Sequence, residues 1–314
     1  MNNIAIIGVG NLGHRHLQSL YELKETQVIY AVEVNEKTIK ALKEEMREVV
    51  YVADIAQLPE EIEVAIIATN SNVRRGVFEQ LFEHSRVKYI IFEKVLFQKE
   101  EDYYFVQKKL KEFGIRAWVN CARREWNAYQ DFKNELASCR EMHFAAIGGD
   151  WGLGCNGIHI LDLIEFLAGS KVEELNIDKL ENGISESKRK GFYEFFGTIV
   201  GKAGKCKNFN ITCIKDSNLP ICLNISTESA RYTIEEGNVI HIISEGTEWK
   251  LREKEFKQVY QSQMTGRIVK SIMENGTCNL TEYDESMDLH LKYIKTLIEF
   301  FNKNGMEGDI CPIT

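Results

Sequence analysis

The sequence has little proline, no long apolar run and no excess of basic residues, and each absence excludes a class of protein. Only three prolines occur in 314 residues, so no proline-rich linker joins its parts. No apolar run approaches the roughly 18 residues of a transmembrane helix. Basic residues number 39 and acidic residues 47, which gives a net charge of −8. This balance disfavours general binding to nucleic acid or to an anionic membrane, because affinity for phosphates requires a cationic surface.

The eight cysteines include no C-x-x-C pair, the spacing typical of zinc and redox sites. The N-terminus lacks the basic region and apolar core of a secretory signal peptide. We therefore expect a cytoplasmic protein whose thiols are reduced and fill the core, and we expect no bound metal.

At 314 residues the chain exceeds the size at which one hydrophobic core usually stops growing, so we expect two domains. Apolar residues make up 44% and charged residues 27%, which is an ordinary globular composition. The pattern changes near residue 120, since strands and helices alternate before it and strands dominate after it. We predict an α/β domain over 1–120 and an α+β domain over 121–314.

Before residue 120, short apolar runs alternate with segments of helical spacing. Runs such as residues 4–7 are typical of strands that are buried on both faces of a parallel sheet. The predicted strands cover 4–7, 27–32, 49–52, 64–68, 89–92 and 116–119. Helices between successive strands imply right-handed crossovers, so the sequence predicts a doubly wound parallel sheet of the Rossmann type.

The first predicted strand leads into a G-x-G-x-x-G motif formed by Gly8, Gly10 and Gly13. In a dinucleotide-binding fold the first glycine permits a tight turn, the second lets the backbone approach a pyrophosphate, and the third lets the helix pack on the strand. The N-terminus of the following helix then faces the phosphates. The alternative is a glycine-rich turn that binds no nucleotide, which the position between a strand and a helix disfavours.

Glu33 ends the second predicted strand, at about the distance from Gly8 that is expected of a ribose-binding acid. A carboxylate here accepts hydrogen bonds from both ribose hydroxyls and repels a 2′-phosphate. We therefore predict NAD(H) as the cofactor in preference to NADP(H). Lys37 is near enough along the chain to soften this preference.

After residue 120 the pattern favours an open, mostly antiparallel sheet with a few helices. We expect strands at 142–147, 192–200, 208–215, 220–227, 230–235 and 238–243, and helices at 128–136, 158–167 and 284–303. Helices would cover one face of this sheet. Because the strands carry many apolar residues, we expect self-association through the other face, which predicts a homodimer or homotetramer.

The sequence resembles, over essentially its whole length, the Gfo/Idh/MocA family (glucose–fructose oxidoreductase and inositol dehydrogenase). The resemblance depends on an ordered set of motifs at residues 6–16, 68–70, 92–94, 119–120 with 123–124, and 157–163. It implies an N-terminal NAD(P)-binding Rossmann domain and a C-terminal domain for substrate binding and oligomerisation. It also implies oxidation or reduction of sugars and polyols, and thus a sugar-like small molecule as the substrate.

The resemblance implies roles for individual residues. Lys94 would hold the reacting hydroxyl oxygen, His159 would take the hydroxyl proton, and Glu93 would position the loop that carries Lys94. The residues implied at the cofactor are Gly8, Gly10, Asn11, Leu12, Gly13, Glu33, Thr69, Asn70 and Glu93. Those expected at the substrate are Arg124, Asn156 and Trp151, the last of which is equally consistent with packing. Without the resemblance, Lys94 is also consistent with an exposed lysine at a strand end, and His159 with a core histidine.

Two positions depart from the family pattern. Val95 replaces the proline that follows Glu-Lys, so we expect a trans peptide bond after Lys94 and a different placement of its side chain. Cys155 replaces the acid four residues before the histidine, and cysteine cannot stabilise an imidazolium as a carboxylate does. Asn156 is three residues before His159 and would orient its ring or a substrate hydroxyl.

Together these features predict an NAD-dependent oxidoreductase that transfers a hydride between nicotinamide and a secondary alcohol or ketone of a sugar, nucleotide sugar or polyol. Two alternatives stay open. One is redox-neutral elimination, epimerisation or glycosidic cleavage with retained NAD. The other is a non-catalytic NAD(H)-binding regulator, which the departures from the family pattern at Val95 and Cys155 favour.

Overall fold

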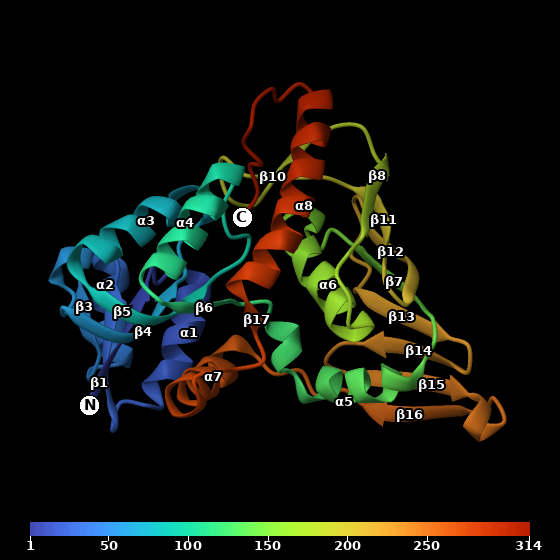
Figure 1. Ribbon diagram of the computed structural model, residues 1–314, viewed down its shortest axis with the longest axis horizontal. Helices are drawn as coiled ribbons and strands as arrows, with labels where there is room; N and C mark the ends of the chain where they lie inside the picture. The colour runs from blue at the N-terminus through green and yellow to red at the C-terminus, as the bar shows by residue number, and fades with distance from the viewer. The chain divides into compact units, whose positions relative to one another are not determined.

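The first strand is buried on both faces because its side chains are apolar at successive positions. Ile4, Ala5 and Ile6 of β1 (Asn2–Ile7) are completely buried, as parallel strands covered by helices require. The computed structural model describes all 314 residues and divides into two units (Figure 1). The first unit comprises residues 1–97, 101–122 and 259–287.

The sheet of the first unit has seven strands. Besides β1 they are β2 (Gln27–Val32), β3 (Val50–Val52), β4 (Glu61–Ile67), β5 (Arg86–Phe92), β6 (Arg116–Val119) and β17 (Thr281–Glu282). Their order is β17-β6-β5-β4-β1-β2-β3, and all neighbours are parallel except β17 and β6. Since β1 pairs with both β2 and β4, the chain switches direction across the sheet at β1, and ligands bind at the carboxyl ends of the strands beside such a switch point.

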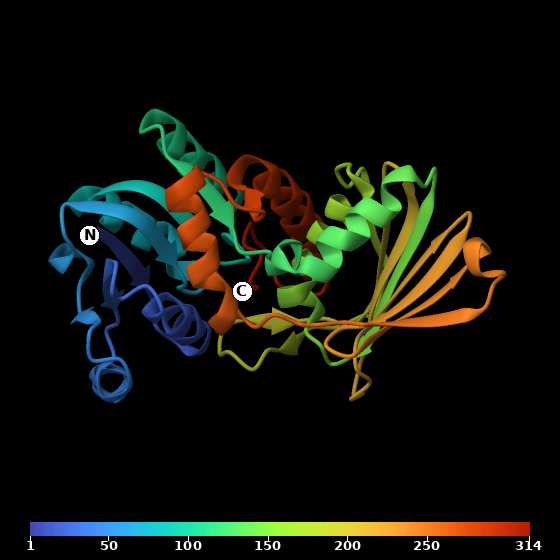
Figure 2. The ribbon, with the colours of Figure 1, turned by 90° about the horizontal axis from the view of Figure 1, so that it is seen from below.

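Helices cover both faces of this parallel sheet. They are α1 (Asn11–Tyr21), α2 (Glu36–Glu45), α3 (Ser71–His84) and α4 (Glu100–Glu112), with a short 3₁₀ turn η1 (Ile55–Gln57). Right-handed crossovers place α1 and α2 on one face and α3 and α4 on the other, as Figure 2 shows. The predicted doubly wound Rossmann sheet is therefore confirmed.

A further helix of the first unit comes from far along the chain. Helix α7 (Gln261–Asn275) packs against α1, where the Gly266 amide donates a hydrogen bond to Ser19 Oγ at 2.9 Å (Figure 1). The predicted second domain includes everything beyond residue 120, with no helix predicted at this place. The segment 259–287 instead returns to the first unit, because the apolar face of α7 is buried against α1 and β17 extends the sheet at β6.

The second unit, residues 98–100, 123–258 and 288–314, is built on an open sheet of eight strands. The strands are β7 (Met142–Gly149), β8 (Glu174–Leu180), β11 (Gly197–Ala203), β12 (Cys206–Ile214), β13 (Cys222–Thr227), β14 (Ala230–Glu235), β15 (Val239–Ser244) and β16 (Leu251–Glu255). Their order is β16-β15-β14-β13-β7-β12-β11-β8, and only β7 and β12 are parallel neighbours. The expected open, mostly antiparallel sheet is confirmed.

One face of this second sheet is covered by helices. Figure 2 shows α5 (Asn127–Glu135) and α6 (Leu153–Ala168) on that side, and Phe144, Ile211 and Ile225 are buried. Alternate residues point to the other side, where Ile147 and Ile214 are 38% and 40% exposed.

Short 3₁₀ turns lie at η2 (Ala122–Glu125), η3 (Leu136–Ser138) and η4 (Glu245–Thr247). The last helix, α8 (Tyr283–Lys303), begins in the first unit and ends in the second. None of the helices is both long and apolar enough to cross a membrane.

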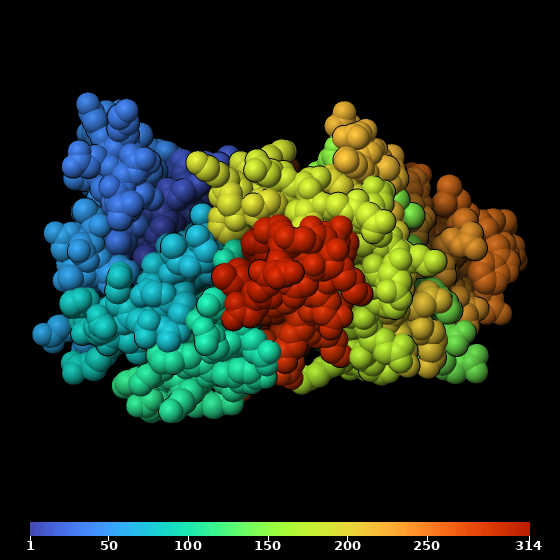
Figure 3. All heavy atoms as spheres, turned by 90° about the horizontal axis from the view of Figure 1, so that it is seen from above, coloured from blue at the N-terminus to red at the C-terminus, as the bar shows by residue number.

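A small hairpin of the second unit is held by the C-terminal segment. Its strands are β9 (Ser185–Glu186) and β10 (Tyr193–Glu194), and the Tyr193 amide donates to the Pro312 carbonyl at 2.9 Å. Figure 3 shows the C-terminal residues, in red, against this part of the chain, in yellow-green. The single strand expected over 192–200 is wrong. The chain leaves β10 after Glu194 and starts β11 only at Gly197, whose φ of +100° breaks the extended run.

At Gly266, where α7 contacts α1, an added methyl group should lower the stability of the fold. A Cβ at Gly266 would lie 2.6 Å from the Ser19 carbonyl oxygen, so Gly266→Ala must push the two helices apart. We expect a loss of about 1–3 kcal/mol in the free energy of unfolding, measured by urea denaturation. Gly76→Ala in α3 is the matched control, because a Cβ there meets nothing within 4 Å. It should leave stability unchanged or raise it by about 0.4–1 kcal/mol, and equal losses in both variants would contradict the packing argument.

Candidate cofactor and active site

The three glycines after β1 differ in backbone conformation and in the space around them. Gly8 has a φ of +89°, which L side chains rarely adopt. A Cβ at Gly13 would lie 2.0 Å from the Gly8 carbonyl oxygen, so only glycine permits this approach of helix and strand. A Cβ at Gly10 would meet nothing within 4 Å, so this backbone faces open space. No side chain caps the N-terminus of α1, where Asn11 and Leu12 form the first turn. The turn therefore fits a pyrophosphate group, which needs close backbone approach and free helical N–H groups.

Glu33 lies at the same turn. Its carboxylate accepts hydrogen bonds from the backbone amides of Val9, at 3.0 Å, and Asn35, at 2.9 Å. The structure thus brings the acid at the end of β2 to the glycine turn after β1.

Thr69 and Asn70 follow β4 at the neighbouring strand end. The methyl group of Thr69 lies 2.8 Å from the place of a Cβ at Gly8, so the two turns are in contact. The Thr69 hydroxyl is buried and forms no hydrogen bond within the protein. Asn70 is the N-cap residue of α3, and its side chain makes no capping hydrogen bond. Both residues therefore sit at the edge of the sheet where the glycine turn opens.

Glu93, directly after β5, is a buried carboxylate with partners from two other elements. It accepts hydrogen bonds from His16 Nε2 of α1, at 2.8 Å, and from Asn120 Nδ2 at the end of β6, at 2.5 Å. The side chains of Glu93 and His16 are 3% and 1% exposed. Burial alone would raise the pKa of Glu93, but the hydrogen bonds and charge of His16, with Asn120 and Lys94, hold its pKa below the usual value. Glu93 is therefore ionised and accepts at both contacts.

Helix α7 completes this polar network. His16 Nδ1 lies 2.9 Å from Thr265 Oγ1, and Gln261 donates to Thr265 Oγ1 at 2.8 Å. Asn120 Nδ2 also donates to Gln261 Oε1 at 2.9 Å. Four elements of the first unit thus meet at one buried charge, which fixes the backbone that leads into Lys94.

The segment after Lys94 is held by Arg74, a buried arginine of α3. Its guanidinium donates to the carbonyls of Val95 and Leu96, the latter at 2.7 Å, and to the carbonyl of Thr69. The peptide bond between Lys94 and Val95 is cis, so the expected trans bond is wrong. Val95, completely buried, and the carbonyls bound by Arg74 fix this segment without a proline.

The predicted residues of the second unit lie near or on α6. Arg124 is paired with Asp162, its Nε donating to Oδ2 at 2.8 Å, and both side chains are buried. Trp151, half-buried before the helix, donates from Nε1 to the Thr212 carbonyl at 2.9 Å. Asn156 Nδ2 donates to the Trp151 carbonyl at 2.7 Å, so these two residues are brought together.

His159 is half-buried one turn further along α6. Just before it, a carboxylate that the sequence analysis missed lies at the first turn of the helix. Glu194 of β10 accepts hydrogen bonds from the amides of Gly154, at 2.6 Å, and Cys155, at 3.2 Å.

His16, Arg74 and Asn120 were also missed as site residues. Asn120 had a signal in the sequence, since it follows the strand β6 as Glu93 follows β5. Arg74 and Glu194 had none, because the Leu96 carbonyl bound by Arg74 and the Gly154 amide bound by Glu194 lie 22 and 40 residues away along the chain.

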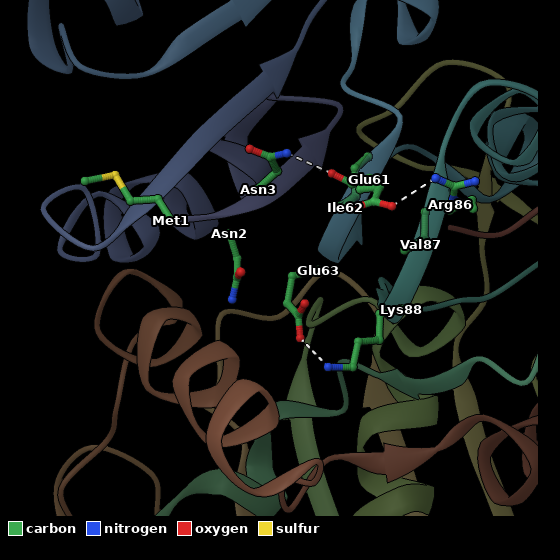
Figure 4. Close-up of a pocket in the computed structure, with 9 residues that line it drawn as sticks. All are labelled: Met1, Asn2, Asn3, Glu61, Ile62, Glu63, Arg86, Val87 and Lys88. Atoms are coloured by element: carbon green, nitrogen blue, oxygen red, sulfur yellow. Dashed lines mark hydrogen bonds and ion pairs between the residues drawn. The ribbon is translucent and has the colours of Figure 1, made fainter.

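A pocket at the opposite edge of the parallel sheet is not part of this arrangement. Figure 4 shows it at the amino ends of β1, β4 and β5, where Glu61 pairs with Arg86 at 2.9 Å and Glu63 with Lys88 at 2.7 Å. Ligands of doubly wound sheets bind at the carboxyl ends, so we do not assign a function to this pocket. No group of three or more His, Cys, Asp or Glu side chains is arranged to hold a metal ion.

The first unit is a Rossmann-type domain, and its glycine turn with Glu33 has the geometry that a bound dinucleotide requires. Residues 2–121 match the model of the Gfo/Idh/MocA family, described as an oxidoreductase family with an NAD-binding Rossmann fold. The match covers the part of the chain that carries the glycine motif, and it agrees with the family that the motifs resemble. No curated protein shows a match to the sequence.

Solved structures share the fold over nearly the whole chain. UDP-N-acetylglucosamine 3-dehydrogenase GnnA from Acidithiobacillus ferrooxidans has a TM-score of 0.73 at 12% identity, covering 94% of this chain and 96% of its own. An oxidoreductase from Agrobacterium radiobacter in complex with NAD+, L-tartaric acid and magnesium has a TM-score of 0.73 at 16% identity, covering 94% of each. The super-repressor mutant of Gal80p from Saccharomyces cerevisiae has a TM-score of 0.73 at 12% identity, covering 97% and 96%. At these identities the likeness establishes the fold.

The buried Glu93 network predicts how stability depends on pH. The pKa of Glu93 is lower in the folded chain than its ordinary value of 4.5, so the unfolded chain binds the proton more readily. Ionised Glu93 therefore contributes stability above about pH 4.5, and the contribution is lost as the pH falls through the folded-state pKa. Glu93→Gln should cost about 1–3 kcal/mol at pH 7 and weaken the acid dependence, as measured by urea unfolding between about pH 7 and pH 3.5.

Glu61→Gln is the control for this prediction. Glu61 forms an exposed ion pair with Arg86, so its loss should cost less than about 0.5 kcal/mol. A Glu93→Gln variant with wild-type stability and an unchanged acid slope would show that the buried carboxylate does not stabilise the fold.

Proposed function

We propose that the chain is an NAD(H)-dependent oxidoreductase acting on a secondary alcohol or ketone of a sugar, nucleotide sugar or polyol. The observation that carries the proposal is the placement of Lys94. It follows β5 at the carboxyl edge of the sheet, between a buried Glu93 network and a segment bound by Arg74, and the glycine turn lies two strands away. The family match over residues 2–121 and the dehydrogenase among the fold relatives support the same class of reaction.

The cofactor site would consist of the glycine turn, Glu33, Thr69 and Asn70. Bound NAD(H) would supply the hydride acceptor or donor. Open space at Gly10 and uncapped amides at α1 suit the pyrophosphate, and the Glu33 carboxylate beside Val9 suits the ribose hydroxyls.

Cofactor preference provides the first test of this proposal. Because Glu33 is negative and already faces the glycine turn, NADH should bind more tightly than NADPH in isothermal calorimetry, and Glu33→Gln should reduce the difference. Glu63→Gln, which removes a carboxylate at the far edge of the sheet, is the control. Tighter binding of NADPH by the wild type would overturn the preference.

In this proposal the side chains of the protein stabilise the reacting oxygen of the substrate and transfer its proton. The Lys94 ammonium would hold the substrate oxygen and stabilise the charge that develops on it. His159 would accept the hydroxyl proton during oxidation and return it during reduction. Trp151, Asn156 and Arg124 would contribute to the substrate site, with Arg124 acting through its pair with Asp162.

Lys94→Ala and His159→Ala should each lower turnover by roughly 10²–10⁴-fold, because each removes a group that acts on the reacting oxygen or its proton. The dissociation constant for NADH, measured by calorimetry, should stay nearly unchanged. Lys88→Ala is the matched control, since Lys88 lies near the amino end of β5, the strand that Lys94 follows at its carboxyl end. Wild-type turnover in either of the first two variants would contradict the roles assigned here.

A non-catalytic NAD(H)-binding regulator is the second candidate. The observations that favour it are the fold shared with a protein named as a super-repressor and the cysteine at position 155. NADH binding without turnover across a panel of sugars and nucleotide sugars would support it. Redox-neutral chemistry would instead give product from such a panel with no net change in NADH absorbance.

The open face of the second sheet supports a homodimer or homotetramer. Its central strands present partly exposed apolar residues there, including Ile147 and Ile214. Light scattering at micromolar concentration is the measurement, and a monomer would contradict the proposal.

A further inference from the structure

The turns after β4 and β5 lie side by side at the carboxyl edge of the parallel sheet. Ile67 at the end of β4 pairs with Phe92 at the end of β5. Thr69 and Lys94 each stand two residues past these paired ends. The Thr69 turn also contacts the glycine turn, because the Thr69 methyl group lies 2.8 Å from the place of a Cβ at Gly8. The position of Lys94 relative to the proposed cofactor site therefore depends on how the two turns are joined.

Arg74 of α3 joins these two turns through one guanidinium group. Its Nη2 donates a hydrogen bond to the Thr69 carbonyl. Its Nη1 donates to the carbonyls of Val95 and Leu96, the latter at 2.7 Å. A helical side chain leans toward the N-terminus of its helix, so this residue in the first turn of α3 reaches back to the strand ends. Three backbone oxygens from two turns are thus bound to a single planar group.

The backbone is held on both sides of Lys94. On one side, the Glu93 carboxylate is fixed by its hydrogen bonds to other elements of the first unit. On the other side, Val95 and Leu96 are completely buried, and their carbonyls are the ones that Arg74 binds. The backbone position of Lys94 is therefore set by contacts with both of its neighbours.

A second side chain holds the segment further from Lys94. Tyr103 of α4 accepts a hydrogen bond from the Phe97 amide at 3.3 Å and donates one to the Phe97 carbonyl at 2.9 Å. This contact lies three residues past Lys94, whereas Arg74 binds the first carbonyl after it. Arg74 therefore restrains the part of the segment that adjoins Lys94.

Packing alone does not require a charge at this place. The Arg74 side chain is 1% exposed. Removing a charged group from water is costly, and apolar residues of similar volume often stabilise a fold as well or better. What an arginine adds is a rigid fork of donors, which fixes the direction of several acceptors at once. The buried guanidinium thus favours a role in the geometry of the two turns.

We propose that Arg74 is a positioning residue for Lys94, whose backbone it holds at a fixed place relative to the cofactor-side turn at Thr69. The inference rests on the proposed function, in which Lys94 holds the reacting oxygen. A misplacement of about 1 Å can lower turnover by about 10²-fold, so loss of this restraint acts on the chemical step. NADH affinity is maintained by the glycine turn and by Glu33, whose carboxylate is held at that turn by the Val9 amide.

The experiment compares the wild type with Arg74→Lys and Leu81→Ala, all as free proteins. A lysine keeps the charge, but its compact ammonium lacks the fork of two nitrogens that spans the turns. Leu81, a completely buried residue of the same helix, is the matched control, because its truncation weakens packing and leaves the guanidinium in place.

Hydrogen exchange followed by NMR gives the exchange rate of the Val95 and Leu96 amides relative to that of the β5 amides in the same protein. This ratio separates local release of the segment from a general loss of stability. It should rise at least about tenfold in Arg74→Lys and keep its wild-type value in Leu81→Ala. An unchanged ratio in Arg74→Lys overturns the inference.

A measurement on the wild type covers the case in which Arg74→Lys does not fold. The Val95 and Leu96 amides must then exchange within about tenfold of the rate of the β5 amides, because a fixed segment opens only together with its strand. Faster exchange of these two amides in the wild type also overturns the inference.

Turnover is measured with the sugar or nucleotide sugar that the wild type converts fastest. In Arg74→Lys, kcat should fall by about 10²-fold, while the dissociation constant for NADH stays nearly unchanged. Leu81→Ala should keep a kcat near that of the wild type at a temperature at which it is folded. A wild-type kcat in Arg74→Lys, or an equal loss in both variants, contradicts the positioning role.

The exchange ratio separates this inference from the proposed function, because it requires no substrate. If the ratio rises in Arg74→Lys while the wild type converts no compound of the panel, the restraint by Arg74 stands and the proposed function fails.

Discussion

A single buried charge, the Glu93 carboxylate, determines much of the first unit. Removing a carboxylate from water costs roughly several kcal/mol, and only well-placed donors offset that cost. Here His16 and Asn120 supply the donors, and Thr265 and Gln261 hold them in turn. Since these residues lie on or beside α1, β5, β6 and α7, no one of these elements can shift without leaving a buried polar group unsatisfied. The hydrogen bonds that Glu93 requires therefore fix the backbone that leads into Lys94.

A second buried charge, the Arg74 guanidinium, explains why the segment after Lys94 tolerates valine. A proline restrains the backbone locally, whereas this chain restrains it from outside. Arg74 binds the carbonyls of Val95 and Leu96 together with that of Thr69, so the turns after β4 and β5 are fixed to one guanidinium. A long-range hydrogen-bonded arginine can thus replace a local conformational restraint, and the departure at position 95 does not leave the loop unsupported.

The parts that could be predicted from sequence are those with local causes. Continuous apolar runs predicted β1, β4 and β5, and the glycine motif predicted a turn whose backbone conformation and open space fit a phosphate. Helix α7 also had a local signal, because Met264, Ile268 and Ile272 recur every four residues, yet its membership in the first unit depends on packing against α1. Arg74 and Glu194 could not be assigned a role, since the Val95 and Leu96 carbonyls bound by Arg74 and the amides bound by Glu194 lie about 20 to 40 residues away along the chain.

Glu194 shows how the end of a helix can depend on a carboxylate from a distant part of the chain. The first turn of α6 contains no acidic residue, and its N-cap residue makes no side-chain capping bond. Glu194 of the β9–β10 hairpin instead accepts hydrogen bonds from the Gly154 and Cys155 amides. A Cβ at Gly154 would lie 2.8 Å from Glu194 Oε2 and one at Gly152 3.2 Å from Oε1, so glycine at both positions leaves room for the carboxylate. Since a negative group stabilises a helix N-terminus, the carboxylate and the two glycines act as one arrangement.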